Sequence, residues 1–163
     1  MAADPRALAA VAPDDRPTVH ALIRAVRLRA RVPIFVLCGP DDTVGPVVDA
    51  VVSATGAERI SLAAWIGQSP HIGWRRPDDL LLEAVGELGA TRGPVLLLDD
   101  AQPIARAAGG WSITSLRAVL LRSVARPMVL VLRASDCEPL RGALEGDGRR
   151  RVFVVGVRAG GTG

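Results

Sequence analysis

Lysine is absent from this chain of 163 residues, and all 20 of its basic residues are arginine. The absence excludes the ammonium group with which phosphate-binding loops normally reach the β- and γ-phosphates of a nucleotide. The arginines are nearly balanced by 17 acidic residues, which leaves a net charge of +3. Such a balance, without interleaved basic and aromatic residues, does not favour a nucleic-acid-binding protein.

Cysteine and histidine are also scarce. The two cysteines, Cys38 and Cys137, are too few for a disulfide framework or a metal site. Because Cys38 ends an apolar run, we expect it to be a small, buried and reduced side chain. His20 and His71 have no neighbouring residues that would complete a metal site. We therefore expect no bound metal.

Long apolar runs are missing as well. None reaches the roughly 18 residues that a membrane-spanning helix needs. The N-terminal segment contains acidic residues and lacks the sustained apolar stretch of a secretory signal. These features predict a cytoplasmic protein with no membrane association.

What the chain does contain is an alternation of apolar runs with helical patterns. Continuous apolar runs are typical of strands that are buried on both faces of a parallel sheet. We expect strands at residues 34–38, 59–63, 94–99, 127–133 and 151–157, and helices at residues 18–31, 44–53, 78–89, 112–125 and 137–144. The alternation predicts an α/β fold, a three-layer αβα arrangement around a five-stranded, mainly parallel sheet. We expect the P-loop ATPase-like strand order 5-1-4-3-2, one domain over residues 17–157, and flexible tails at residues 1–16 and 158–163.

The first predicted strand leads into the sequence GPDDTVGPV at residues 39–47. A working phosphate loop reads G-x-x-x-x-G-K-[ST], whereas five residues separate Gly39 from Gly45 here. Pro46 stands at the lysine position, so both a cation and an amide donor are lost. Val47 stands at the Ser/Thr position and has no hydroxyl group to ligate magnesium. We expect no nucleotide cofactor at this vestigial loop.

Two carboxylates in the same loop oppose phosphate binding. Asp41 and Asp42 would each repel a phosphate charge by about 3 kcal/mol at ~5 Å and an effective dielectric constant of ~20. A simpler interpretation of the loop is that Asp42 or Thr43 caps the following helix.

A second acidic site follows the run VLLL, where Asp99 and Asp100 end the third predicted strand. In active triphosphatases such a pair holds the hydration shell of magnesium and polarises the attacking water. The alternative is that both residues cap or pair locally with arginine. The next strand ends at the position of a polar sensor, for which the candidates are Arg133, Ser135 and Asp136. We hypothesise that Arg133 pairs with Asp99 or Asp100 and replaces the lost ligand.

Three segments carry a family resemblance over roughly residues 32–157. In order, VPIFVLCGPDDTVGPVVDAVV, VLLLDDAQPI and RPMVLVLRASD resemble the core of the STAND branch of AAA-type P-loop ATPases. Gly39 and Gly45 match the loop glycines imperfectly, Pro46 and Val47 depart from the motif, and Asp99 and Asp100 match its acidic pair. Chains without the catalytic loop resemble inactive STAND domains, which implies an interaction or sensing module in bacterial conflict and signalling systems. The helical lid expected after the last strand is also missing.

The predicted function is therefore a regulatory or protein–protein interaction module with no catalytic residues. Trp74, Arg75 and Arg76 lie in a segment broken by glycine and proline, and they form a candidate patch for a protein partner. The alternative for Trp74 is packing over the sheet. A second possible function is residual ATP binding or weak hydrolysis with a cation supplied by another chain. A third is a DNA-associated accessory subunit, whose contacts would come from Arg24, Arg27, Arg31, Arg75 and Arg76.

Overall fold

The computed structural model describes residues 5–28, 34–68, 77–102, 113–134, 137–145 and 150–156. Its five strands form one parallel sheet in the order β2-β3-β4-β1-β5. The strands are β1 (Ile34–Gly39), β2 (Glu58–Ser61), β3 (Leu96–Asp99), β4 (Met128–Arg133) and β5 (Val152–Val154). Read from the other edge, this is the predicted order 5-1-4-3-2, so the α/β prediction and the strand order are confirmed.

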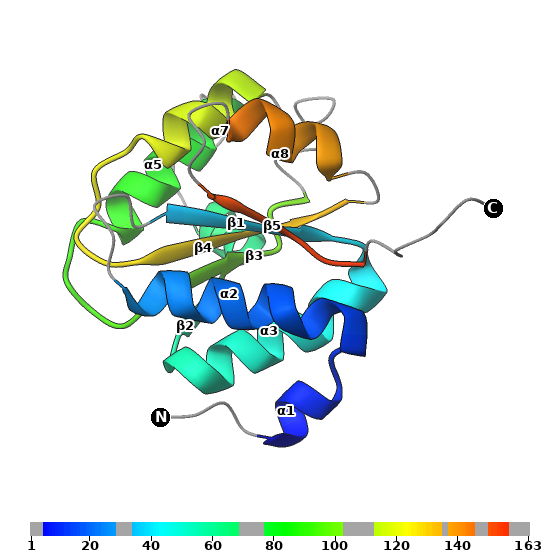
Figure 1. Cartoon of the computed structure of the whole chain (residues 1–163). Coiled ribbons are helices and arrows are strands. Elements are labelled where there is room, and N and C mark those ends of the chain that lie inside the picture. The colour runs from blue at the N-terminus through cyan, green and yellow to red at the C-terminus, as the bar shows by residue number, and fades with distance from the viewer. Residues whose placement is uncertain are drawn as a thin grey trace.

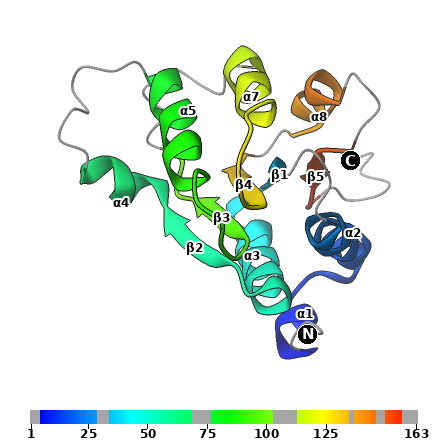
Figure 2. The same cartoon turned by 90° about the vertical axis from the view of Figure 1, so that its left-hand side faces the viewer.

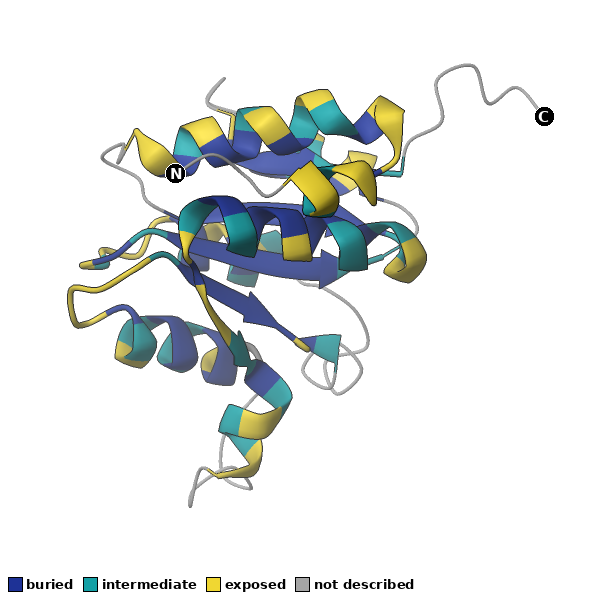
Figure 3. Cartoon of the chain, turned by 90° about the horizontal axis from the view of Figure 1, so that it is seen from below, coloured by how far each residue is buried: buried dark blue, intermediate teal, exposed yellow. Residues whose placement is uncertain are grey.

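Helices cover both faces of the sheet (Figures 1 and 2). One face packs against α1 (Pro5–Ala9), α2 (Arg16–Arg27) and α3 (Asp41–Thr55), and the other against α4 (Leu62–Gly67), α5 (Pro77–Leu88), α7 (Ile113–Leu120) and α8 (Glu138–Leu144). Successive strand residues point to opposite faces. Phe35 and Leu37 therefore join the first core, whereas Ile34 and Val36 join the second. Figure 3 shows the central strands buried between the layers, as the continuous apolar runs predict.

The N-terminal segment differs from the prediction of a flexible tail. Residues 5–15 form α1 and the short 3-10 helix η1 (Pro13–Asp15). Val11 is buried in the core that α2 and α3 share, and the carboxylate of Asp15 accepts a hydrogen bond from the Gly156 amide at 2.9 Å. The segment is fixed by contacts with residues far away in the sequence, which its Ala/Pro/Asp composition does not reveal.

Several element boundaries also differ from the predictions. Helix α3 begins at Asp41 rather than at residue 44, and α7 ends at Leu120 rather than at residue 125. Helix α4 begins inside the strand predicted at residues 59–63, because the Ser61 hydroxyl accepts a hydrogen bond from the Ala64 amide and caps the helix. The predicted partner patch of Trp74, Arg75 and Arg76 lies outside the described residues. The same is true of the sensor candidates Ser135 and Asp136, of the possible DNA contact Arg31, and of His71.

The cysteines correct a further prediction. Cys38 is buried, as expected, but it is joined to Cys137 by a disulfide that links β1 to the start of α8. The two residues are 99 positions apart in the sequence, and only the pairing of β1 with β4 brings them together. None of the helices in the described ranges is long and apolar enough to cross a membrane.

Candidate functional site

The corner between β1 and α3 is where the vestigial phosphate loop was predicted. Strand β1 ends at Gly39 and α3 begins at Asp41, so Pro40 alone separates them. The Pro40 carbonyl accepts hydrogen bonds from the amides of Thr43 and Val44 at 3.1 and 2.9 Å. Amides that a phosphate loop would aim at its ligand are thus already part of the first helical turn.

This geometry corrects one detail of the sequence analysis. The N-cap of α3 is Pro40, which makes no side-chain capping bond, so neither Asp42 nor Thr43 caps the helix. Asp41 and Asp42 instead occupy the first turn, where the helix dipole favours negative charge. Pro46, which stands at the lysine position of the motif, lies inside the helix, in its second turn.

The same corner is closed by packing. A Cβ atom added to Gly39 would lie 2.7 Å from the Val155 Cγ2 atom and 2.9 Å from the Val44 Cγ2 atom. A Cβ atom added to Gly156 would lie 2.8 Å from the Pro40 Cδ atom. Glycine is therefore needed at Gly39 because the end of β5 and the helix approach its backbone closely. Gly45, in contrast, has no atom within 4 Å of an added Cβ atom.

The second acidic site is occupied by arginine. The Asp99 side chain at the end of β3 is only 1% exposed. Arg133 donates two hydrogen bonds to it, from Nε to Oδ1 at 3.2 Å and from Nη2 to Oδ2 at 2.9 Å. Arg59 donates a third to Oδ2 at 2.9 Å, and the Asp100 amide a fourth to Oδ1 at 2.8 Å. The hypothesis that Arg133 pairs with the acidic motif is confirmed for Asp99.

The ion pairs continue outward from Asp99 over two further carboxylates. Arg133 also contacts the exposed Asp41 at 3.4 Å, and Arg59 contacts the exposed Asp49 at 3.7 Å. Exposed pairs of this kind contribute little to stability, because water screens them. Asp99 is thus the centre of the network. Arg59 was not predicted as a partner of Asp99, although β2 lies beside β3 in the predicted strand order.

The network determines the charge state of its members. Burial by itself would raise the pKa of Asp99, but the hydrogen bonds from Arg133, the Asp100 amide and Arg59 outweigh it and hold the pKa below its ordinary value. The hydrogen bond to Asp99 raises the pKa of Arg133. Asp99 is therefore an ionised carboxylate at neutral pH whose charge is compensated within the protein. To bind a cation or polarise a water molecule it would first have to leave its arginines.

Asp100 has a different environment from its neighbour. Its side chain is exposed, and its backbone has a φ of 56°, in the left-handed region. Aspartate tolerates this region better than most residues. Gln102, just beyond, donates a side-chain hydrogen bond to the Arg133 carbonyl and ties the end of β4 to the segment after β3. The structure therefore brings Asp99, Arg133 and Gln102 together, while Asp100 is exposed.

No protein-family model and no curated protein sequence matches this chain. The resemblance to STAND ATPases stays a prediction from the three sequence segments. In the part of the chain that the structure describes, no group of three or more His, Cys, Asp or Glu residues is arranged to hold a metal ion.

Proposed function

We propose that this chain is a catalytically inactive ATPase-like domain that acts as a protein–protein interaction or regulatory module. The module would be of the kind found in bacterial conflict and signalling systems. The observation that supports this most is the pairing of Asp99 with Arg133 and Arg59 at the end of β3. An ATPase uses that carboxylate for catalysis, whereas here both of its oxygen atoms accept hydrogen bonds from the protein itself.

The β1–α3 corner supports the same proposal. Nucleotide hydrolysis needs a cradle of amides and a cation at the phosphates. Pro40 and α3 replace the cradle, and the sequence provides proline where the lysine would stand. With its catalytic groups replaced, such a domain would act through its surface. The nearly balanced charge favours a protein over nucleic acid as the partner.

We also propose the cytoplasm as its location. In that compartment disulfides are mostly transient, catalytic or regulatory. The Cys38–Cys137 disulfide would then belong to the regulatory class rather than serve as a permanent cross-link.

Calorimetric titration with ATP and magnesium tests the loss of the nucleotide site. We expect no binding heat from the wild-type chain and none from Asp99→Ala. The double variant Pro46→Lys, Val47→Thr restores the two missing side chains, and we expect it to stay inactive because the amides remain within α3. Micromolar binding by the wild type that Asp99→Ala abolishes would instead support residual nucleotide binding.

The interaction part of the proposal needs a separate experiment. Proteins encoded beside this chain can be co-expressed with it and analysed by size-exclusion chromatography. Co-elution that survives in moderate salt supports the proposal. Absence of any complex, together with steeply salt-dependent binding to duplex DNA, would favour a DNA-associated subunit.

A further inference from the structure

We propose that the Cys38–Cys137 disulfide is a redox-controlled tether for the N-terminal end of α8. In the oxidised chain the disulfide holds this end on the carboxyl edge of the sheet. Reduction releases it, while the rest of the sheet stays folded. The inference rests on the proposed cytoplasmic location, where such a disulfide is reduced, and not on the proposed loss of ATPase activity.

The two ends of α8 are anchored differently. At the C-terminal end, the Glu145 carboxylate accepts hydrogen bonds from the amides of Arg151 and Val152, and Arg117 donates to the Ala143 carbonyl. At the N-terminal end, Cys137 is the N-cap residue and makes no side-chain capping bond. The disulfide is the covalent tie of this end to β1. Cleavage of that bond therefore affects one end of the helix while the anchors of the other end persist.

The partner strand cannot move in response to reduction. Cys38 is fully buried in β1, and β1 is hydrogen-bonded to β4 on one side and to β5 on the other. Two thiol groups need more room than one disulfide, because non-bonded heavy atoms prefer separations of roughly 3.5–4.0 Å, well beyond a covalent S–S bond. Cys137 and the start of α8 therefore have to move to make room for the second thiol.

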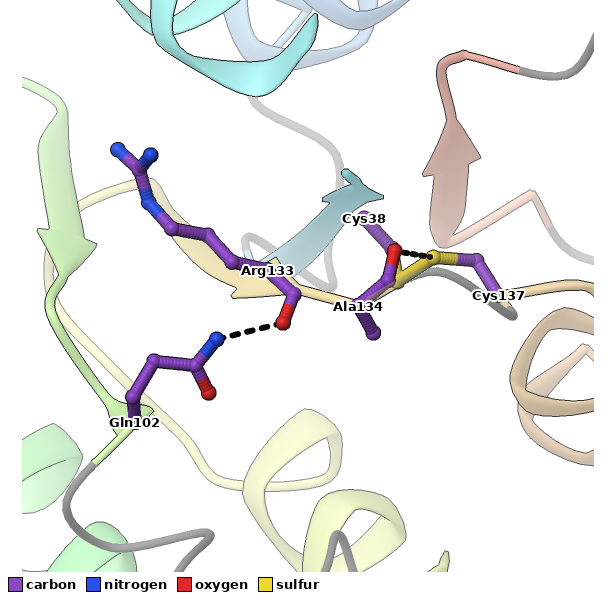
Figure 4. Close-up of a disulfide and its surroundings, with 5 residues drawn as sticks. All are labelled: Cys38, Gln102, Arg133, Ala134 and Cys137. Atoms are coloured by element: carbon purple, nitrogen blue, oxygen red, sulfur yellow. Dashed lines mark hydrogen bonds between the residues drawn. A yellow bond between two sulfur atoms is a disulfide. The ribbon is translucent and has the colours of Figure 1, made fainter. Parts of the chain in front are cut away.

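The reduced state has a hydrogen-bond partner ready for one thiol. The Cys137 Sγ atom lies 3.5 Å from the Ala134 carbonyl oxygen (Figure 4). A sulfur atom in a disulfide carries no proton, so this contact becomes an S–H···O hydrogen bond only after reduction. The amide of the same Ala134 donates to the Gly39 carbonyl at 2.9 Å, which keeps the end of β4 paired with β1 in both states. Arg133 and its contact with Asp99 then persist as α8 loosens.

The chemical step is a thiol–disulfide exchange with a dithiol reductant. A thiolate of the reductant attacks the Cys137 sulfur atom, because Cys137 is 5% exposed whereas Cys38 is 0% exposed. This forms a mixed disulfide at Cys137 and releases Cys38 as a thiolate, which takes up a proton. The second thiol of the reductant then attacks the reductant sulfur atom that is bonded to Cys137. Cys137 leaves and is protonated, and the reductant becomes a disulfide. The two electrons and the two protons both come from the dithiol.

Hydrogen–deuterium exchange of the full chain, with and without dithiothreitol, tests the inference. Titration of thiols in the denatured, air-oxidised chain first establishes the disulfide. On reduction we expect amide exchange in α8 to accelerate by about tenfold or more, with β1 and β3 unchanged. Reoxidation should restore the slow exchange. The matched control is the variant Cys38→Ser, Cys137→Ser, in which dithiothreitol should change nothing.

Three results would overturn the inference. Two free thiols in the air-oxidised chain would mean that no disulfide forms. Equal acceleration of amide exchange in α8, β1 and β3 would mean that the disulfide stabilises the whole fold. No acceleration in α8 on reduction of the wild-type chain would mean that the disulfide tethers nothing. The wild-type measurement decides between these outcomes even if the double variant does not fold.

Discussion

The two ends of this sheet each contain a partly buried ion pair, but the burial is arranged in opposite ways. At the carboxyl end the acid is the buried member, since the Asp99 side chain is 1% exposed and two arginines reach it from β2 and β4. At the amino end the base is the buried member. Arg126 is 8% exposed and donates to Glu58 and to the Pro94 carbonyl, each at 2.8 Å, while the Glu58 side chain is 52% exposed.

The difference predicts that loss of one partner from each ion pair lowers the stability of the fold by unequal amounts. Removal of a partner from a buried charge leaves that charge uncompensated in a poorly solvated environment. When an exposed charge loses its partner, water solvates that charge. Loss of Arg133 should therefore harm the fold more than loss of Arg126, although both arginines connect neighbouring strands.

Replacement of Arg133 by glutamate should give the largest effect. The variant places a second carboxylate beside the buried Asp99 and should lower the free energy of unfolding by about 3–5 kcal/mol. Urea denaturation followed by circular dichroism measures the change. Arg141→Glu is the surface control, because the ion pair of Arg141 with Glu138 lies on the exposed side of α8. A loss for Arg133→Glu as small as that of the control would contradict the buried network.

Replacement of Arg126 by methionine should give a moderate effect. Methionine keeps much of the buried volume, and both Glu58 and Pro94 are exposed residues. We expect a loss of about 1.5–3 kcal/mol, the range for hydrogen bonds to a charged group. If this variant were less stable than Arg133→Glu in the same urea series, the comparison between the two ends would be wrong.

Acidification should reduce the stability that Asp99 contributes at the carboxyl end of the sheet. Because the folded pKa of Asp99 lies below its ordinary value of 3.8, its contribution to stability is full above that value. The contribution is lost as the pH falls through the lower, folded pKa. Urea midpoints measured from pH 7 down to pH 2.5 should thus fall less steeply for Asp99→Asn than for the wild type. The Arg126→Met variant should keep the wild-type slope, and identical slopes for all three chains would exclude the Asp99 network as the cause.

Substitution of Asp100 should give the smallest effect on stability. The result distinguishes the role of Asp100 from that of its neighbour Asp99. Alanine at this position has to adopt a positive φ without the local hydrogen bonding available to aspartate, which should cost roughly 1 kcal/mol. Asp100→Gly should stay within about 0.5 kcal/mol of the wild type, because glycine adopts positive φ freely. Equal losses for Asp100→Gly and Asp100→Ala would show that the lost carboxylate matters, and a larger loss for glycine would contradict the positive φ as the cause.

Much of the fold was predictable because its cause is local. The apolar runs at β1, β3 and β4 are long enough to require burial on both faces, and their alternation with helices leads to a parallel sheet. The pairing of Arg133 with the acidic motif followed from both lying at the carboxyl ends of strands. The β1–α3 corner was harder. The spacing of Gly39 and Gly45 indicated a loop, but the helix begins at Asp41 because the Pro40 carbonyl is free to accept its first amides.

The sequence by itself determined the alternating architecture and the absence of a phosphate-binding lysine, because both depend on residue type and order along the chain. Only the tertiary structure decided that Asp99 is the acid paired with arginine, that Arg59 is one of its partners, and that Cys38 forms a disulfide with Cys137. These contacts join residues 34, 40 and 99 positions apart. They depend on which strands become neighbours and in which register, and a continuous apolar run buried on both faces has no alternation to specify that register.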